Sequence, residues 1–243
     1  MAFGGQGRTA GLWGAAGNMD RRFFIAARGA LYFGMGAVMA CARIVKDGAP
    51  FGMAMVACSG AGLSGVFALL GACLGYLVGG GLEWGIRYIA ASVLVYTIAF
   101  VFHEVGAYKN EYFMPAVAAL VMGLTGFLGS FSAESGAIPV MASLFLELTL
   151  AFGGAYFFRD ALDGALRSSE TAELKHSVSL MVMASCMLMA LERVVLFEAV
   201  SLGRFFALLL VMTSAMKGGM LTGAAVGTVL GLAMDIAGEG PLY

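Results

Sequence analysis

The sequence predicts an all-α protein, a polytopic transmembrane helical bundle of about eight to ten membrane elements with glycine-rich packing faces. Hydrophobic residues make up 60% of the 243 residues and charged residues only 12%, about half the charge of a soluble domain. The apolar residues form continuous runs, without the polar alternation of membrane β-strands. The 36 glycines are a further sign, because glycine is more frequent in membrane helices than in soluble ones.

Residues 1–22 are predicted to be a cytoplasmic N-terminal tail. They are mostly small or polar, and Arg8, Arg21 and Arg22 precede the first apolar run, a charge bias typical of cytoplasmic segments. The segment is not a cleavable signal, because the run at 23–42 is long enough to span and more spans follow.

The apolar stretch 51–79 is too long for one straight span of about 20 residues. Ser59–Gly62 is a natural break, which predicts two elements, Phe51–Ser59 and Leu63–Gly79. The first is short enough to be re-entrant, and this requires protein to cover its backbone. The sequence leaves open whether the stretch crosses once or twice. Two crossings agree better with the positive-inside rule, because they place the basic 159–177 link inside.

The remaining chain divides into further predicted spans with short links. The spans are 86–103, 115–131, 138–158, 178–197, 202–216 and 220–236. Turns are expected at Gly80–Trp84, Ser132–Gly136 and Lys217–Gly219, and polar links at Glu104–Glu111 and Arg159–Ser177, the last beginning with a short interfacial helix. The membrane domain is thus 23–237, and 238–243 is expected to precede a missing further span and cytoplasmic domains.

Glycines at every fourth position predict two helix-packing faces. Such glycines share one stripe of a helix, and a stripe without side chains lets another helix approach at backbone distance. One face carries Gly71, Gly75 and Gly79, and the other carries Gly219, Gly223, Gly227 and Gly231. We expect these faces to pack the bundle, and the second to support a homo-oligomer in the lipid bilayer.

Glu147 is the candidate intramembrane polar residue, because it falls near the middle of the 138–158 span. A carboxylate there is costly in lipid, so it should face the bundle interior. One interpretation is proton or cation handling, or a polar contact that sets helix register. The other is a carboxyl bonded to a Ser, a Thr or the backbone of a neighbouring span.

Other function classes lack a sequence signal. We predict no catalytic, cofactor-binding or metal-binding residues, because the sequence shows no nucleotide motif, catalytic triad or metal-ligand spacing. Net charge is −1, so nothing in the composition indicates a nucleic-acid partner, and none is predicted. The pairs Glu192 with Arg193 and Glu198 with Arg204 lie near predicted span ends, where solvated interface charge is expected. The cysteines and the methionine-rich run are interpreted as core residues: Cys41, Cys58, Cys73, Cys186, Met181, Met183, Met187 and Met189.

Two glycine-bearing stretches carry a family resemblance. The first runs through Ala49–Ala54, Leu69–Tyr76 and Arg87–Ala91, and the second through Leu202–Phe205, Gly218–Gly219, Gly223–Gly227 and Leu230–Leu232. Together they resemble the N-terminal membrane region of stage II sporulation protein E, the PP2C-type serine/threonine phosphatase of endospore-forming bacteria. The resemblance covers about residues 31–237.

The resemblance implies a role for this segment within a longer protein. That family has about ten membrane spans, then a division-associated region, then a manganese-dependent phosphatase that dephosphorylates an anti-sigma-factor antagonist. This chain has none of the PP2C aspartates, so manganese, the antagonist and the tubulin-like division protein would bind missing cytoplasmic domains. The segment itself would anchor the enzyme in the cell membrane and at the asymmetric division septum, and help it self-associate.

The alternative is a small stand-alone transporter or channel with Glu147 as its polar site. Asp235 and the possible interruptions at 51–79 and around Lys217 favour it, because transporters often contain discontinuous helices. The halves of the chain show no convincing repeat, and the span interiors are poor in polar residues.

Overall fold

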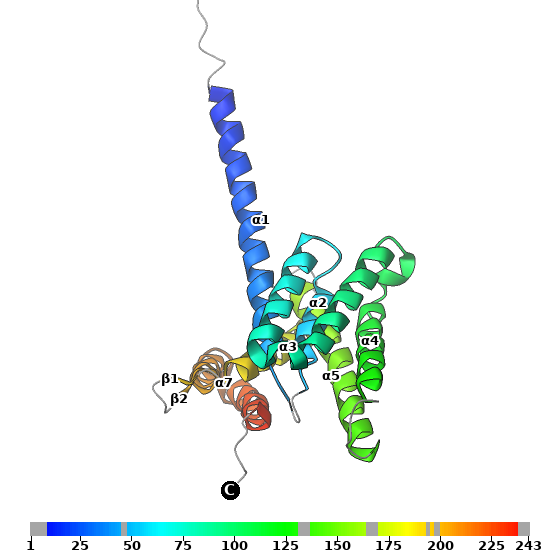
Figure 1. The fold of residues 1–243 in the computed structure, drawn as a ribbon. Coiled ribbons are helices and arrows are strands. Elements are labelled where there is room, and N and C mark those ends of the chain that lie inside the picture. The colour runs from blue at the N-terminus through cyan, green and yellow to red at the C-terminus, as the bar shows by residue number, and fades with distance from the viewer. Residues whose placement is uncertain are drawn as a thin grey trace, which may run out of the picture.

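The computed structural model describes residues 9–44, 48–130, 137–163, 170–192, 195–196 and 200–237, and over these it is helical (Figure 1). The helices are α1 Thr9–Cys41, α2 Phe51–Cys58, α3 Leu63–Phe102, α4 Phe113–Ser130, α5 Ala137–Asp163, α6 Glu170–Leu191 and α7 Leu202–Ala237. A 3₁₀ turn, η2 Gly106–Lys109, precedes α4, and a two-residue antiparallel pair, β1 Val195–Leu196 with β2 Val200–Ser201, precedes α7. The predicted helical class is confirmed. Among the described residues, three helices, α3, α5 and α7, are long and apolar enough to cross a membrane.

Helix α3 is a hairpin of two antiparallel limbs rather than one rod. Gly81 interrupts it with φ 78° and ψ 179°. Tyr76 and Tyr88, on either side of the break, stack with ring centroids 5.2 Å apart, whereas 12 positions of a straight helix would separate them by roughly 18 Å. Further along, Tyr96 donates a hydrogen bond to the carbonyl of Ala61. The turn predicted at Gly80–Trp84 is therefore confirmed.

Helix α7 folds back in the same way at Gly219, where φ is 80° and ψ is −178°. A Cβ built on Gly223 would lie 2.5 Å from the Cβ of Ala215, and one built on Gly227 would lie 3.6 Å from Val211. The predicted turn at Lys217–Gly219 is confirmed. In Figure 1, α7 is seen almost along its axis while α1, α4 and α5 run up the page, so this second hairpin lies across the others.

Helix α1 runs parallel to the first limb of α3. Cβ atoms built on Gly71 and Gly75 would lie 2.0 Å from the carbonyl oxygen of Phe33 and 2.3 Å from that of Ala37. The constant offset shows that both helices run in the same direction. Residues 42–62 must therefore return the chain from the end of α1 to the start of α3, across roughly 20 Å.

Helix α2 lies at the centre of that return and of the bundle. Seven of its eight residues are buried, and it contacts α1, α3, α4 and α5. The break predicted at Ser59–Gly62 is confirmed, since α2 ends at Cys58 and α3 begins at Leu63. Protein covers the backbone of this short element, as a re-entrant segment requires.

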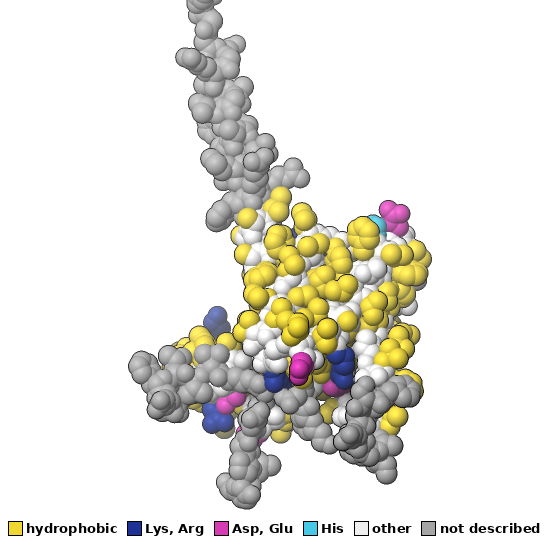
Figure 2. Space-filling view, in the orientation of Figure 1, with side chains coloured by type: hydrophobic (Ala, Val, Ile, Leu, Met, Phe, Trp, Pro, Cys, Tyr) yellow, Lys and Arg dark blue, Asp and Glu magenta, His cyan; other side chains and the backbone are white. Residues whose placement is uncertain are grey.

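The later helices alternate in direction around α2. Phe102 contacts Phe113 where α3 meets α4, at 6.0 Å between centroids. A Cβ built on Gly126 of α4 would meet Leu144 of α5, and Ser179 of α6 donates to Asp160 of α5. Figure 2 shows hydrophobic side chains over the flank of the bundle and charged ones near its two ends.

Several predicted boundaries differ from the structure. Helix α1 begins at Thr9, so residues 9–22, predicted as a tail, are helical. Helix α5 continues to Asp163 and α6 begins at Glu170, which shortens the predicted 159–177 link. Helix α6 ends at Leu191, before the predicted 197. An apolar run shows which part of a helix a bilayer can cover. The helix itself can extend beyond that part, because residues such as Ala, Glu and Lys favour helix in polar surroundings as well.

Candidate functional site

Glu147 of α5 is ion-paired with Arg87 of α3, through Oε2 and Nη2. The two side chains are 13% and 29% exposed, respectively. Arg87 lies six positions after the break at Gly81, so the fold-back of α3 brings it to the flank of α5. The expectation that Glu147 bonds a neighbouring Ser, Thr or backbone group is wrong, because its partners are an arginine and a tyrosine.

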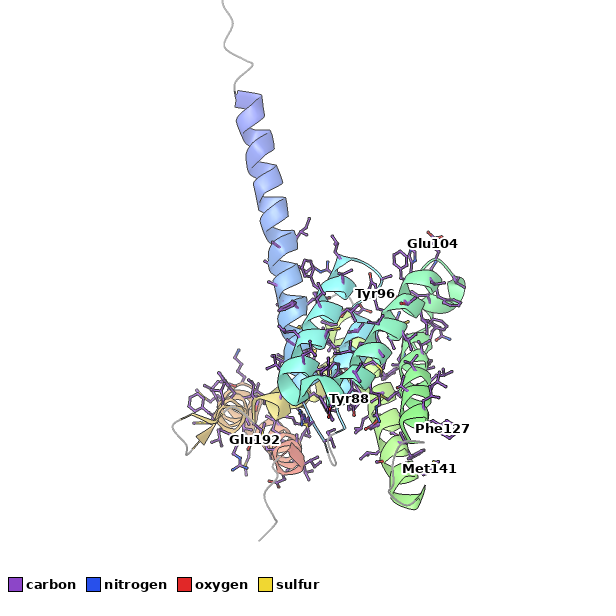
Figure 3. The ribbon with its side chains drawn as sticks, in the orientation of Figure 1. Tyr88, Tyr96, Glu104, Phe127, Met141 and Glu192 are labelled. Carbon is purple, nitrogen blue, oxygen red and sulfur yellow. The ribbon has the colours of Figure 1, made fainter. Side chains whose placement is uncertain are left out.

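Tyr88 supplies the second contact to the carboxylate. Its hydroxyl donates to Glu147 Oε1 at 3.1 Å and accepts from Arg87 Nη2 at 3.2 Å. The hydroxyl also lies 3.3 Å from the backbone N–H of Ala49, which donates to it. Tyr88 is 3% exposed and stands between α3 and α5 (Figure 3). Both carboxylate oxygens of Glu147 are therefore occupied by contacts within the protein.

Tyr76 binds the chain just before and inside α2. Its hydroxyl donates to the carbonyl of Ala49 at 3.0 Å and accepts from the N–H of Met53 at 2.9 Å. The first N–H groups of any helix lack partners within the helix, so this contact satisfies one of them. Gly52 leaves room for the tyrosine, since a Cβ there would lie 2.6 Å from the hydroxyl.

The polar network joins three elements far apart in the sequence. We call it the Glu147 network: Glu147, Arg87, Tyr88, Tyr76 and the backbone of 49–53. It fixes α5 to the second limb of α3 and both to the start of α2. Within the described residues, Arg87 Nε is a buried nitrogen without a hydrogen-bond partner.

Aromatic and cationic groups cover the adjacent end of the bundle. Trp84 packs on Tyr88 with centroids 4.9 Å apart. The guanidinium carbon of Arg43 lies 4.0 Å from the centre of the Trp84 ring, and Arg43 also donates to the carbonyl of Gly79. These contacts tie the chain that leaves α1 to the turn of α3.

The structure places the predicted packing glycines in different situations. Gly71 and Gly75 face the backbone of α1 at a distance that excludes a Cβ, and Gly79 is at ordinary contact distance from Arg43 and Cys41. In α7, Gly223 and Gly227 face Ala215 and Val211 of the other limb. The expected four-residue stripe is wrong at Gly219, which forms the turn, and Gly231 has no atom within 4 Å of a built Cβ.

The charges near the end of α6 form one described pair. Arg204 Nε lies 2.9 Å from Glu192 Oε1, and Ser201 donates to the other oxygen of Glu192. Glu192 is 10% exposed and Arg204 61%, so Glu192 is a buried anchor rather than the solvated charge expected. Arg193 and Glu198 lie outside the described residues. Among those that are described, no group of three His, Cys, Asp or Glu side chains could hold a metal ion.

No protein-family model, curated protein or solved structure matches this chain. The resemblance to the sporulation phosphatase therefore rests on the two stretches alone. The first of these contains Ala49, Met53, Tyr76, Arg87 and Tyr88, so the Glu147 network draws every member but Glu147 from it.

Proposed function

We propose that this chain is a membrane anchor and self-association region of a sporulation serine/threonine phosphatase that acts at the asymmetric division septum. The observation that carries the anchoring role is the Glu147 network. Both oxygens of the Glu147 carboxylate bind partners within the protein and so hold α2, α3 and α5 together. This is expected of a domain whose role in lipid is structural. The phosphatase activity, its manganese and its antagonist substrate belong, on this proposal, to cytoplasmic domains outside this chain.

The proposed orientation places the N-terminus and the Ser59–Gly62 end of the bundle in the cytoplasm. Arg28, Lys109, Arg159 and Lys175 belong to this end, consistent with the positive-inside rule. The opposite end carries Arg43, Arg87 and Arg204, and each of these charges is held within the protein: Arg43 by Trp84 and the Gly79 carbonyl, Arg87 by Glu147, and Arg204 by Glu192. Helix α2 then forms the core of a second crossing.

We propose that α7 is the self-association element. Only 6% of its most apolar window is buried, and large apolar side chains remain exposed on both limbs: Leu208, Met212, Met216, Met220, Leu221 and Leu232. Lipid or a second copy must cover them in a membrane. Gly231 offers an open position for close approach of another helix.

The transporter alternative has less support. A proton- or cation-coupling carboxylate needs an oxygen that can be exchanged between protein and ligand, whereas Arg87 and Tyr88 hold both oxygens of Glu147. Purified protein in liposomes under an ion gradient tests it. Ion-coupled flux abolished by Glu147→Gln would promote this alternative, and absence of flux would eliminate it.

The anchor proposal is tested by the size of the native protein. Mass spectrometry of the source organism should find peptides that continue beyond Tyr243 into a soluble domain with PP2C-type acidic residues. A fluorescent fusion of the full-length protein should concentrate at the asymmetric septum. A native product ending at Tyr243 in an organism that makes no spores would reject the proposal.

A further inference from the structure

A cavity of about 210 Å³ lies at the proposed cytoplasmic end of the bundle. Helix α1, the loop after α2, η2, α4 and α5 all contribute to its wall. Two of its lining residues are arginines, Arg28 from α1 and Arg159 from α5, and two are tyrosines, Tyr32 and Tyr108. Such polar walls are unusual in a chain with so few charges, so the cavity is a candidate binding site.

The charge in this cavity favours an anion. Arg159 donates to the carbonyl of Asn110 at 3.0 Å, and its Nε lies 3.7 Å from the Asp163 carboxylate. The guanidinium carbon of Arg28 lies 5.6 Å from the centre of the Tyr32 ring. Among the described residues that line the cavity, two carry a guanidinium group and one carries a carboxylate, so their charges sum to one positive charge in excess. Arginine presents N–H donors in a geometry that matches phosphate oxygens.

An apolar groove of about 260 Å³ adjoins the cavity and shares Arg28 with it. Helices α1 and α3 form its walls, through Ile25, Gly29, Leu63 and Phe67. A single arginine therefore lies where a polar cavity meets a hydrocarbon-like groove. The two surfaces together are complementary to an amphiphile, a molecule in which a charged head is joined to an apolar tail.

We propose that the cavity and groove together bind one anionic phospholipid from the cytoplasmic leaflet. The phosphate diester would lie between Arg28 and Arg159 within reach of the Tyr108 hydroxyl, and an acyl chain would lie in the groove along Phe67. One negative charge on the diester matches the single excess positive charge. A zwitterionic lipid would bring an added ammonium group close to two guanidinium groups. The proposal rests on the membrane insertion argued under Proposed function.

Native mass spectrometry of the purified chain in detergent tests this site. Phosphatidylglycerol and phosphatidylcholine with identical acyl chains are added separately, and the occupancy of the first bound lipid is measured. We expect wild-type protein to prefer phosphatidylglycerol about tenfold, the scale of one strong charge-assisted contact. Arg28→Gln should abolish the preference. Lys109→Gln is the matched control, because Lys109 is an exposed cation at the same end that lines neither cavity nor groove.

A second titration separates a lipid from a free phosphate. Glycerophosphoglycerol, the same headgroup without acyl chains, should fail to displace bound phosphatidylglycerol at equal concentration. Displacement by it would overturn the acyl-chain part of the site, and equal binding of the two lipids, or an unchanged preference in Arg28→Gln, would overturn the site itself. These outcomes leave the anchor proposal standing, because that depends on the downstream domain and on topology.

Discussion

Arg87 and Glu147, 60 positions apart in the sequence, form an ion pair beside the start of α2. The pair exists only because α3 reverses at Gly81 and α5 passes along its second limb. It is bound to α2 through Tyr88, so three parts of the bundle depend on one contact.

Replacing one partner of the ion pair should destabilise the domain more than replacing both partners. Arg87→Met leaves a largely buried carboxylate without its counter-charge, which we expect to destabilise the domain by about 3 kcal/mol. For a chain of this size that lowers the melting temperature in detergent by roughly 6–12 °C. Arg87→Met with Glu147→Leu should recover most of the loss.

Lys109→Gln is the control for this experiment, because Lys109 is an exposed cation with no carboxylate partner among the ion pairs of the described residues. Its effect on the melting temperature should be small. If the double variant is as unstable as the sum of its single changes, the ion pair does not hold the bundle together as described.

The Tyr76 hydroxyl should contribute measurably to stability. Tyr76→Phe leaves the Met53 N–H and the Ala49 carbonyl without this buried partner, a loss of about 1–3 kcal/mol. Tyr112→Phe serves as the control, since that side chain is 56% exposed. Thermal denaturation followed by size-exclusion chromatography compares the two. Equal melting temperatures would show that the network around α2 is dispensable.

Glycines in the α1–α3 contact should tolerate replacement by alanine less well than glycines that face open space. Gly71→Ala would place a Cβ 2.0 Å from the Phe33 carbonyl oxygen and force the helices apart. Gly34→Ala meets no atom within 4 Å, and gains up to about 1 kcal/mol of helix propensity. Melting temperatures should therefore fall for Gly71→Ala and hold or rise for Gly34→Ala. The reverse order would refute the close packing of α1 on α3 at Gly71.

The turn of α7 should tolerate no side chain. Gly219 has φ 80° and ψ −178°, a region open almost only to glycine, so Gly219→Ala should cost about 1–3 kcal/mol. Gly231→Ala, in helix with nothing near its built Cβ, should cost nothing. Protease resistance of the α7 segment in detergent distinguishes the variants. Equal resistance would argue that α7 is one straight helix.

Lys175 holds α6 to the bundle, and its contribution to stability should not depend on pH through the neutral range. Its pKa is raised, first by a hydrogen bond with Tyr156 and then by the carboxylates of Asp160 and Glu111, against an opposing effect of burial. A raised lysine pKa gives stabilisation that is complete below the unfolded value, about 10.4, and is lost only above it. The melting-temperature difference between wild type and Lys175→Met should stay constant from pH 7 to 9.5. A difference that vanished within that range would contradict the raised pKa.

The order of the helical segments could be predicted because its signals are local. Three consecutive glycines, 79–81, mark the turn of α3, two, 218–219, mark the turn of α7, and Ser59–Gly62 marks the end of α2. Helix ends were less predictable. Nothing in an apolar run shows that α5 continues through Arg159 to Asp163, because helix propensity and bilayer thickness are separate constraints.

The partner of Glu147 could not be predicted from the sequence. Arg87 lies in the first turn of its predicted span, where an arginine ordinarily reaches the interface. Its placement against α5 depends on the fold-back at Gly81 and on long-range packing. A signal did exist: an arginine followed by a tyrosine in an apolar stretch is a possible counter-charge for an acid buried elsewhere.

The glycine pattern predicted close approach but not the partner. Gly71 and Gly75 pack on α1, in parallel with it, although short connections favour antiparallel neighbours. Gly223 and Gly227 pack within the α7 hairpin instead of on a separate helix. The glycine spacing shows which face of a helix lacks side chains, and tertiary contacts decide which segment packs against that face.

Between the end of α1 and the start of α3 the chain returns through the bundle, so that α1 and the first limb of α3 cross in the same direction. Cysteine accessibility tests this return most directly, with Cys41, Cys58, Cys73 and Cys186 replaced and single cysteines placed at Lys46, Gly62, Glu83 and Lys109. In intact cells, an impermeant maleimide should label positions 46 and 83, and reach 62 and 109 only after permeabilisation. Labelling of positions 46 and 62 from the same side would contradict the return crossing and the topology built on it.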